Sequence, residues 1–215
     1  DDLDYIEAVA GAVNEANLNV ITLPGIGTRY HLKMVKEYGI DIAKFATQIT
    51  EADISEQHIK MARELGLKPI GGLTGATTIS VAETVRQAKL MESYGAEVVY
   101  LYDGSGYLLP HQVEERISAM YESLDIPIGF HAHNNLQLAV ANTITAIESG
   151  AEYIDASLKG FGAGAGNCPT EVLVAVCDRM RIETGIDLYT IMDIAKNDLK
   201  PLMPRPMELD NDRIM

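Results

Sequence analysis

The chain repeats one unit, a short β-rich apolar run followed by an amphipathic helical stretch, about every 25 to 30 residues. Glycines at positions 39, 66, 95 and 150 each follow a helical stretch, which is the expected chemistry of a helix C-cap. Repeated βα units predict a parallel sheet with helices packed on it. Six strands are predicted, at Asn19–Leu23, Ile40–Thr47, Pro69–Leu73, Val98–Asp103, Ile128–His133 and Tyr153–Ser157.

The repeat favours an α/β fold of the (β/α)8 TIM-barrel type, which needs eight strands and about 250 residues. This sequence has 215 residues and opens in a predicted helix, Leu3–Ala16, so the first two strands are expected before Asp1. We interpret it as a fragment or the ordered part of a longer chain. The expected domains are a TIM barrel over 1–186, holding strands 3 to 8, and the start of a C-terminal helical region at 187–215. An open doubly wound sheet is the alternative, disfavoured because no G-x-G-x-x-G turn follows a strand.

The charge balance excludes two classes of partner. The formal net charge is −14, whereas nucleic acids and anionic membranes are bound by basic surfaces. No apolar run approaches the roughly 18 residues of a membrane span, and the acidic start is unlike a signal peptide. The two cysteines, Cys168 and Cys177, suggest neither a disulfide framework nor a zinc ribbon. We therefore expect a cytoplasmic protein without nucleic-acid or membrane partners.

The segment 128–135, I-G-F-H-A-H-N-N, carries the strongest chemical signal. Residues two apart on a strand point to the same face, so His131 and His133 both aim into the barrel at its C-terminal mouth. Two imidazoles with a carboxylate and open positions suit a divalent transition metal. Hydrogen-bonded core histidines are the alternative, and the strand-end position beside Asn134 and Asn135 favours metal ligands.

Two other loops follow predicted strands at the same mouth. The glycine-rich segment 160–169 lets a backbone approach an anionic ligand closely, and Asn167 within it is a candidate metal or substrate contact. Tight packing and a helix N-terminal turn are the alternatives there. Asp103 and Ser105, in D-G-S-G, are candidate substrate-binding residues, with a turn-forming role as the alternative.

The sequence resembles the 4-hydroxy-2-oxovalerate aldolases, within the larger family that holds hydroxymethylglutaryl-CoA lyase and isopropylmalate synthase. The matching stretches cover nearly the whole chain. They include L-P-G-I-G-T at 23–28, M-E-S-Y-G-A at 91–96, H-A-H-N-N at 131–135, G-A-G-A-G-N at 162–167 and D-L-Y at 187–189. The sequence differs from the aldolases at two places. One is Gly104, where the aldolases have serine or threonine, and the other is the stretch 73–78.

By this resemblance His131 and His133 would hold a divalent ion, Mn2+ in the first place, with Mg2+ or Co2+ as alternatives. Tyr189 would be catalytic, orienting the substrate or transferring a proton. The aspartate ligand, its neighbouring arginine and the histidine base would precede Asp1. The C-terminal helical region, which docks an acylating acetaldehyde dehydrogenase in this family, would continue past Met215.

The function implied is retro-aldol cleavage of a 4-hydroxy-2-oxo acid to pyruvate and a short aldehyde, a step of aromatic hydrocarbon catabolism. Two alternatives stay open. One is a related acyl-CoA lyase or Claisen-condensing enzyme, and the other is a non-catalytic barrel fragment that binds a metal without turnover.

Overall fold

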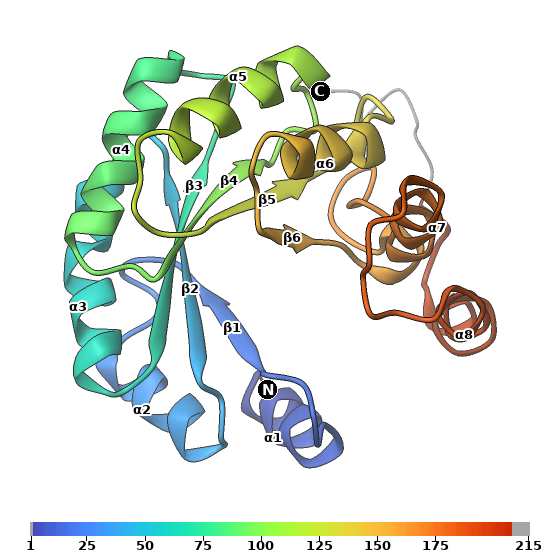
Figure 1. The fold of residues 1–215 in the computed structure, drawn as a ribbon. Helices are drawn as coiled ribbons and strands as arrows, with labels where there is room; N and C mark the ends of the chain where they lie inside the picture. Colours follow the sequence, from blue (N-terminus) through green and yellow to red (C-terminus); the bar gives the residue numbers. More distant parts are fainter. Residues whose placement is uncertain (1, 208–215) are drawn as a thin grey trace.

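The structure, a computed structural model, describes residues 2–207 and contains a single parallel sheet. Its strand order β1-β2-β3-β4-β5-β6 follows the sequence, so each crossover joins neighbours. A doubly wound sheet would reverse this order at a switch point, so that alternative is excluded. The curved sheet of Figure 1 is a partial (β/α)8 barrel. The strands are β1 (Asn19–Thr22), β2 (Ile42–Gln48), β3 (Lys68–Thr74), β4 (Val98–Asp103), β5 (Ile128–Ala132) and β6 (Tyr153–Asp155).

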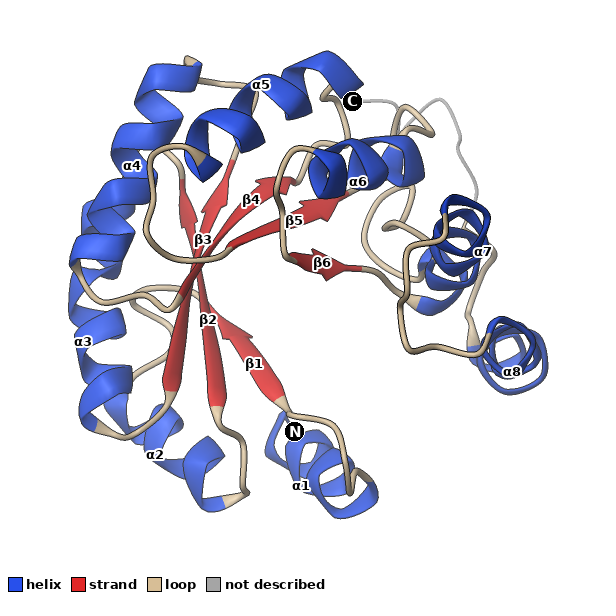
Figure 2. Cartoon of the chain, viewed as in Figure 1, coloured by secondary structure: helices blue, strands red, loops and turns tan. Residues whose placement is uncertain are grey.

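Helices cover the convex face of the sheet (Figure 2). The α-helices are α1 (Asp2–Ala12), α2 (Arg29–Glu37), α3 (Glu56–Glu64), α4 (Val81–Ser93), α5 (Pro110–Tyr121), α6 (Ala139–Glu148), α7 (Thr170–Met180) and α8 (Leu188–Ile194). Shorter turns of helix lie at Ala52–Ser55, Leu158–Gly160, Ala195–Leu199 and Lys200–Leu202. None of the helices within residues 2–207 is long and apolar enough to cross a membrane.

The predicted helix caps are confirmed, and one predicted helix start is wrong. Gly39, Gly66, Gly95 and Gly150 all have positive φ angles, between 71° and 107°, which glycine adopts without steric cost. The amphipathic pattern of residues 135–149 predicts a helix from residue 135, but α6 begins at Ala139, because the Asn134 side chain accepts a hydrogen bond from the Ala139 amide across an intervening turn.

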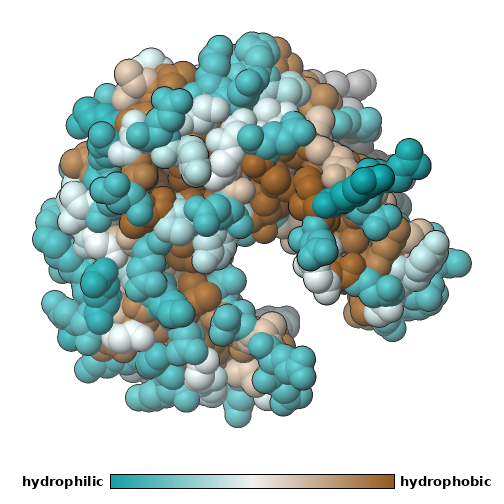
Figure 3. All heavy atoms as spheres, in the orientation of Figure 1, coloured by the Kyte–Doolittle hydropathy of each residue, from teal (hydrophilic) through white to brown (hydrophobic). Residues whose placement is uncertain are grey.

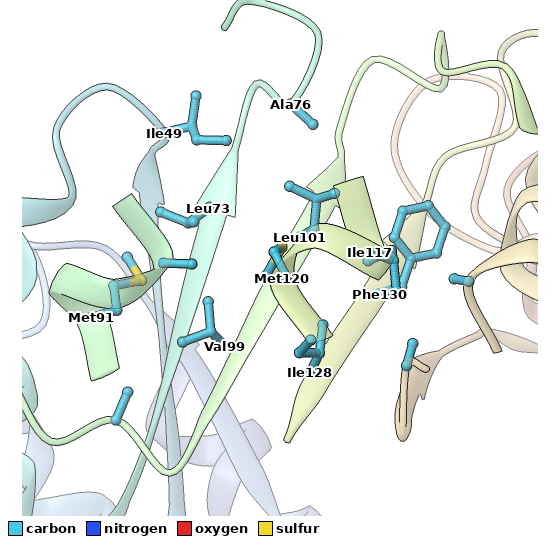
Figure 4. Close-up of a cluster of buried hydrophobic side chains, with 14 of the residues drawn as sticks. Ile49, Leu73, Ala76, Met91, Val99, Leu101, Ile117, Met120, Ile128 and Phe130 are labelled. Atoms are coloured by element: carbon cyan, nitrogen blue, oxygen red, sulfur yellow. The ribbon is translucent and has the colours of Figure 1, made fainter. Parts of the chain in front are cut away.

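The main core lies between the sheet and its helices. Figure 4 shows side chains from alternate strand positions meeting residues of the covering helices. Phe45, Leu101 and Phe130 on the strands are fully buried, as are Met91 and Ile117 on the helices. Burying one such side chain contributes about 1.5–3 kcal/mol, so the packing of this outer face stabilises the fold.

The concave face of the sheet opens onto a broad hollow in the space-filling view (Figure 3). Strands β1 and β6 end the sheet on either side of it. Their inward-facing residues Ile21 and Tyr153 are 61% and 46% exposed. The inner face is therefore where side chains can meet a ligand.

Candidate metal centre

Strand β5 delivers the two histidines to the same side of the sheet. His131 lies on β5, and His133 follows it, donating its backbone N–H to Asp103 O at 3.1 Å. The alternation of side chains along an extended chain places both rings on the inner face. Their centroids are 5.1 Å apart, so the structure brings the two predicted ligands together.

Asp155 fixes the His131 ring from the neighbouring strand β6. His131 Nδ1 lies 3.2 Å from Asp155 Oδ2, and the register of the sheet sets the two residues opposite each other. Because a carboxylate can only accept, the neutral imidazole that makes this hydrogen bond carries its proton on Nδ1 and has its lone pair on Nε2. Burial raises the pKa of Asp155, but the hydrogen bond from His131 and the charge of Lys44 outweigh it and leave that pKa below its usual value.

Lys44 and Tyr100 complete this inner cluster. Lys44 Nζ, on β2, lies 2.7 and 2.9 Å from the two carboxylate oxygens of Asp155. The same ammonium stands 3.8 Å from the centre of the Tyr100 ring, a cation–π contact. Burial, and then the charge of Asp155, raise the pKa of Tyr100. The Lys44 ammonium thus holds Asp155, and Asp155 in turn holds His131.

Sequence reasoning missed Lys44, Tyr100 and Asp155. One signal was available, since a lysine at an alternating position inside the apolar run 42–47 has to face a polar interior or an ion pair. Its partner lies 111 positions away and follows only from the assembled sheet.

Asn167 approaches the histidines from the glycine-rich loop. It forms an isolated antiparallel bridge with His133, and its side-chain Nδ2 donates to Phe161 O at 3.2 Å. A Cβ on Gly162 would lie 2.4 Å from Nδ2, so glycine is needed for the loop to close on this side chain. The buried Asn167 Oδ1 has no hydrogen-bond partner among the described residues.

The donors present fit a divalent ion. Burial, followed by the proximity of His131, lowers the pKa of His133, and a neutral imidazole is the form that binds metal. Two imidazoles and the unpaired Asn167 oxygen form a nitrogen and oxygen donor set suited to such an ion. Within residues 2–207 no three His, Cys, Asp or Glu side chains gather into a complete cage. Among the described residues, the candidate protein ligands are therefore two histidines and an amide.

The other predicted site residues lie apart from this centre. The register pairs Asp103 with Ala132, which puts its side chain on the outer face. Its carboxylate accepts hydrogen bonds from the amides of Tyr107 at 3.0 Å and Leu108 at 3.1 Å, and Ser105 Oγ is 3.4 Å away. These contacts match the turn-forming alternative for the D-G-S-G loop.

Tyr189 occupies the first turn of α8 and its side chain is 77% exposed. Figure 2 shows α8 well apart from β5, so the described structure does not bring Tyr189 to the histidines. Its predicted catalytic role stays a prediction.

Comparison with known proteins finds a matching family profile and similar curated proteins. The sequence profile described as HMGL-like matches residues 1–197. A protein of Desulfitobacterium hafniense named 4-hydroxy-2-oxovalerate aldolase is 63% identical, over all of this chain and 64% of its own length. One of the same name from Bacillus cereus is 52% identical, over all of this chain and 63% of its own length. The chain thus spans under two thirds of these curated relatives.

Solved structures share the fold. The N-terminal domain of a putative aldolase from Bacteroides vulgatus has a TM-score of 0.80 at 22% identity, covering 91% of this chain and 67% of that one. The carboxyl transferase domain of Rhizobium etli pyruvate carboxylase has a TM-score of 0.83 at 17% identity, covering 91% of this chain and 36% of that one. At these identities the likeness establishes the barrel fold alone.

Proposed function

Because the chain belongs to the HMGL-like family, we propose that it acts in the divalent-metal-dependent cleavage of 4-hydroxy-2-oxopentanoate-type acids to pyruvate and a short aldehyde. The observation that carries this proposal is the pair of histidine rings 5.1 Å apart at the end of β5, with His131 fixed by Asp155. The names of the relatives at 63% and 52% identity support the same reaction.

The reaction breaks one carbon–carbon bond. The 4-hydroxyl loses a proton, the bonding electron pair moves toward the 2-oxo group, and the methyl carbon of the product pyruvate later gains a proton. A divalent ion at the site would supply Lewis-acid polarisation of the 2-oxo group. His131 and His133 would hold this ion, with Asn167 Oδ1 as the third protein donor. We propose Mn2+, with Mg2+ and Co2+ as alternatives.

Asp155 and Lys44 are positioning residues in this proposal. The carboxylate accepts a hydrogen bond from His131 Nδ1, and this contact sets the angle of the ring and leaves Nε2 to bind an ion. Lys44 in turn fixes the carboxylate through an ion pair of 2.7 Å. Neither side chain needs to touch the substrate.

The other site residues predicted from the sequence are Tyr189, Ser105 and Asp103. Tyr189 is a predicted catalytic residue, and Ser105 a predicted substrate contact. For Asp103 the turn hydrogen bonds make a structural role the better supported one. We also propose the barrel over 1–186 and a helical region over 187–215, of which residues 208–215 lie outside the described structure. That region would dock an acylating acetaldehyde dehydrogenase. We also propose that the protein lies in the cytoplasm and that its reaction belongs to aromatic hydrocarbon catabolism.

Pyruvate release from 4-hydroxy-2-oxopentanoate tests the proposal. The purified protein should release pyruvate in the presence of Mn2+, and this release should stop when a chelator is added. The His131→Ala variant should not release pyruvate. His111→Ala, on the exposed side of α5, is the matched control and should keep it.

Three results would contradict the proposal. Pyruvate release that continues after chelation, or in the His131→Ala variant, would show that the reaction does not depend on a metal held by His131. Cleavage of an acyl-CoA thioester substrate instead would indicate the related lyase. Stoichiometric Mn2+ binding without any release would leave a non-catalytic metal-binding barrel.

A further inference from the structure

Tyr102 lies beside the histidine pair, and its hydroxyl forms no hydrogen bond with the described residues. The register of the sheet sets it opposite His131, and the two ring centroids are 5.0 Å apart. Both side chains therefore face the inner side. Tyr102 is only 5% exposed, and its buried hydroxyl has no hydrogen-bond partner among the described residues.

The neighbouring Tyr100 makes the contrast informative. Each ring lies against a glycine of the next strand, because a Cβ on Gly72 would be 2.5 Å from the Tyr102 ring and one on Gly129 would be 2.3 Å from the Tyr100 ring. The Tyr100 ring carries the Lys44 ammonium 3.8 Å from its centre, whereas the Tyr102 ring faces His131. Of these two phenols, it is Tyr102 that has a fully buried hydroxyl without a hydrogen-bond partner among the described residues.

A buried hydroxyl without a partner destabilises a fold, and phenylalanine would fill the same space without that cost. An unpaired buried hydroxyl calls for an explanation, and one that lies beside the histidine pair is a candidate to bind a ligand there. A phenol O–H is a hydrogen-bond donor, so this hydroxyl can donate to an oxygen atom of a ligand.

We propose that Tyr102 Oη donates a hydrogen bond to an oxygen atom of the 2-oxo acid that binds at His131 and His133. The inference rests on the proposed function and adds a substrate-binding residue to it. The ligand class is a small anion with adjacent carboxylate and oxo oxygens, because such an anion offers one oxygen to the ion and another to the phenol.

Binding of oxalate, a planar mimic of the pyruvate enolate, tests this inference. Calorimetric titration of the Mn2+-loaded protein should give an oxalate dissociation constant about tenfold weaker for Tyr102→Phe than for the wild type, the loss of one hydrogen bond. The Mn2+ dissociation constant should stay the same. Tyr121→Phe, which removes a hydroxyl from a 59% exposed tyrosine on α5, is the matched control and should change neither constant.

The melting temperature in chelator gives a readout that is independent of the metal. Tyr102→Phe should keep or raise it, since an unpaired hydroxyl is removed. Equal oxalate affinity in the variant and the wild type would overturn the inference, as would a lower melting temperature, which would make the hydroxyl structural. A wild-type protein that binds Mn2+ but no oxalate would overturn the proposed function itself.

Discussion

The two faces of the sheet come from the same strands but differ in the side chains that they bury and in the contacts of those side chains. On β4 the outward residues Val99 and Leu101 are fully buried in an apolar core under the helices. The inward residues Tyr100 and Tyr102 of the same strand are nearly as buried, yet they lie among Asp155, His131 and the ammonium of Lys44. Burial alone therefore does not distinguish the faces. Their polar contacts do.

This difference separates stability from chemistry. The outer face can be understood from apolar area removed from water, at about 25 cal/mol per Å2. The inner face retains charges and hydroxyls that a core would exclude unless they were paired. Substitutions on the outer face should change the free energy of unfolding, and substitutions on the inner face should change ligand binding.

The largest expected effect is on the outer face. Phe130→Ala should lower the free energy of unfolding by about 3–5 kcal/mol, because the side chain is fully buried and its removal leaves a cavity. Urea denaturation in the presence of chelator measures it. Phe161→Ala, at a 43% exposed phenylalanine, is the control, expected to cost roughly 0.5 kcal/mol or less. Similar costs for the two variants would contradict the comparison.

A smaller effect is expected at the inner ion pair. Asp155→Asn should weaken Mn2+ binding about 10- to 100-fold, the usual effect of losing the partner that orients a metal-binding histidine. Asp41→Asn is the matched control, because Asp41 forms an exposed ion pair with Lys36 at 2.7 Å. An Mn2+ affinity that is the same in Asp155→Asn and the wild type would show that the carboxylate does not act on His131.

The smallest effect tests whether water reaches the inner face at Tyr100. The raised pKa of Tyr100 means that its phenol stays neutral in the folded protein at about pH 11, where an ordinary tyrosine is ionised. Because the shift is upward, it contributes stability that is present below the ordinary tyrosine pKa and lost as the pH rises above it.

Tyrosinate absorbance measures this. Tyr100→Phe should reduce the signal of the urea-unfolded protein and leave that of the folded protein unchanged. Tyr5→Phe, at a 76% exposed tyrosine, should reduce both signals. A loss of folded-state signal in Tyr100→Phe would mean that water reaches the inner face.

Local features of the sequence predicted much of this arrangement. The apolar runs, the glycines that end the helices and the alternation within H-A-H specify strands, caps and a shared face, all of which depend on neighbours within a few residues. Asp103 shows a limit of that reasoning. It ends its strand at the mouth as expected, but the register gives the inward position to Tyr102.

The rest of the centre depends on contacts between distant parts of the chain. Lys44 and Asp155 come from strands four apart in the sheet and meet because the sheet curves. No local pattern contains that curvature. Likewise the unpaired oxygen of Asn167 becomes visible only when the glycine-rich loop folds back against His133.

The central claim is that the inner face holds one divalent ion between His131 and His133. Electron paramagnetic resonance titration with Mn2+ tests it most directly, comparing the wild type with His131→Ala, His133→Ala and the exposed control His31→Ala. The account predicts one tightly bound ion per chain in the wild type and in His31→Ala, and none in the other two variants. Stoichiometric binding that persists in both His131→Ala and His133→Ala would contradict it.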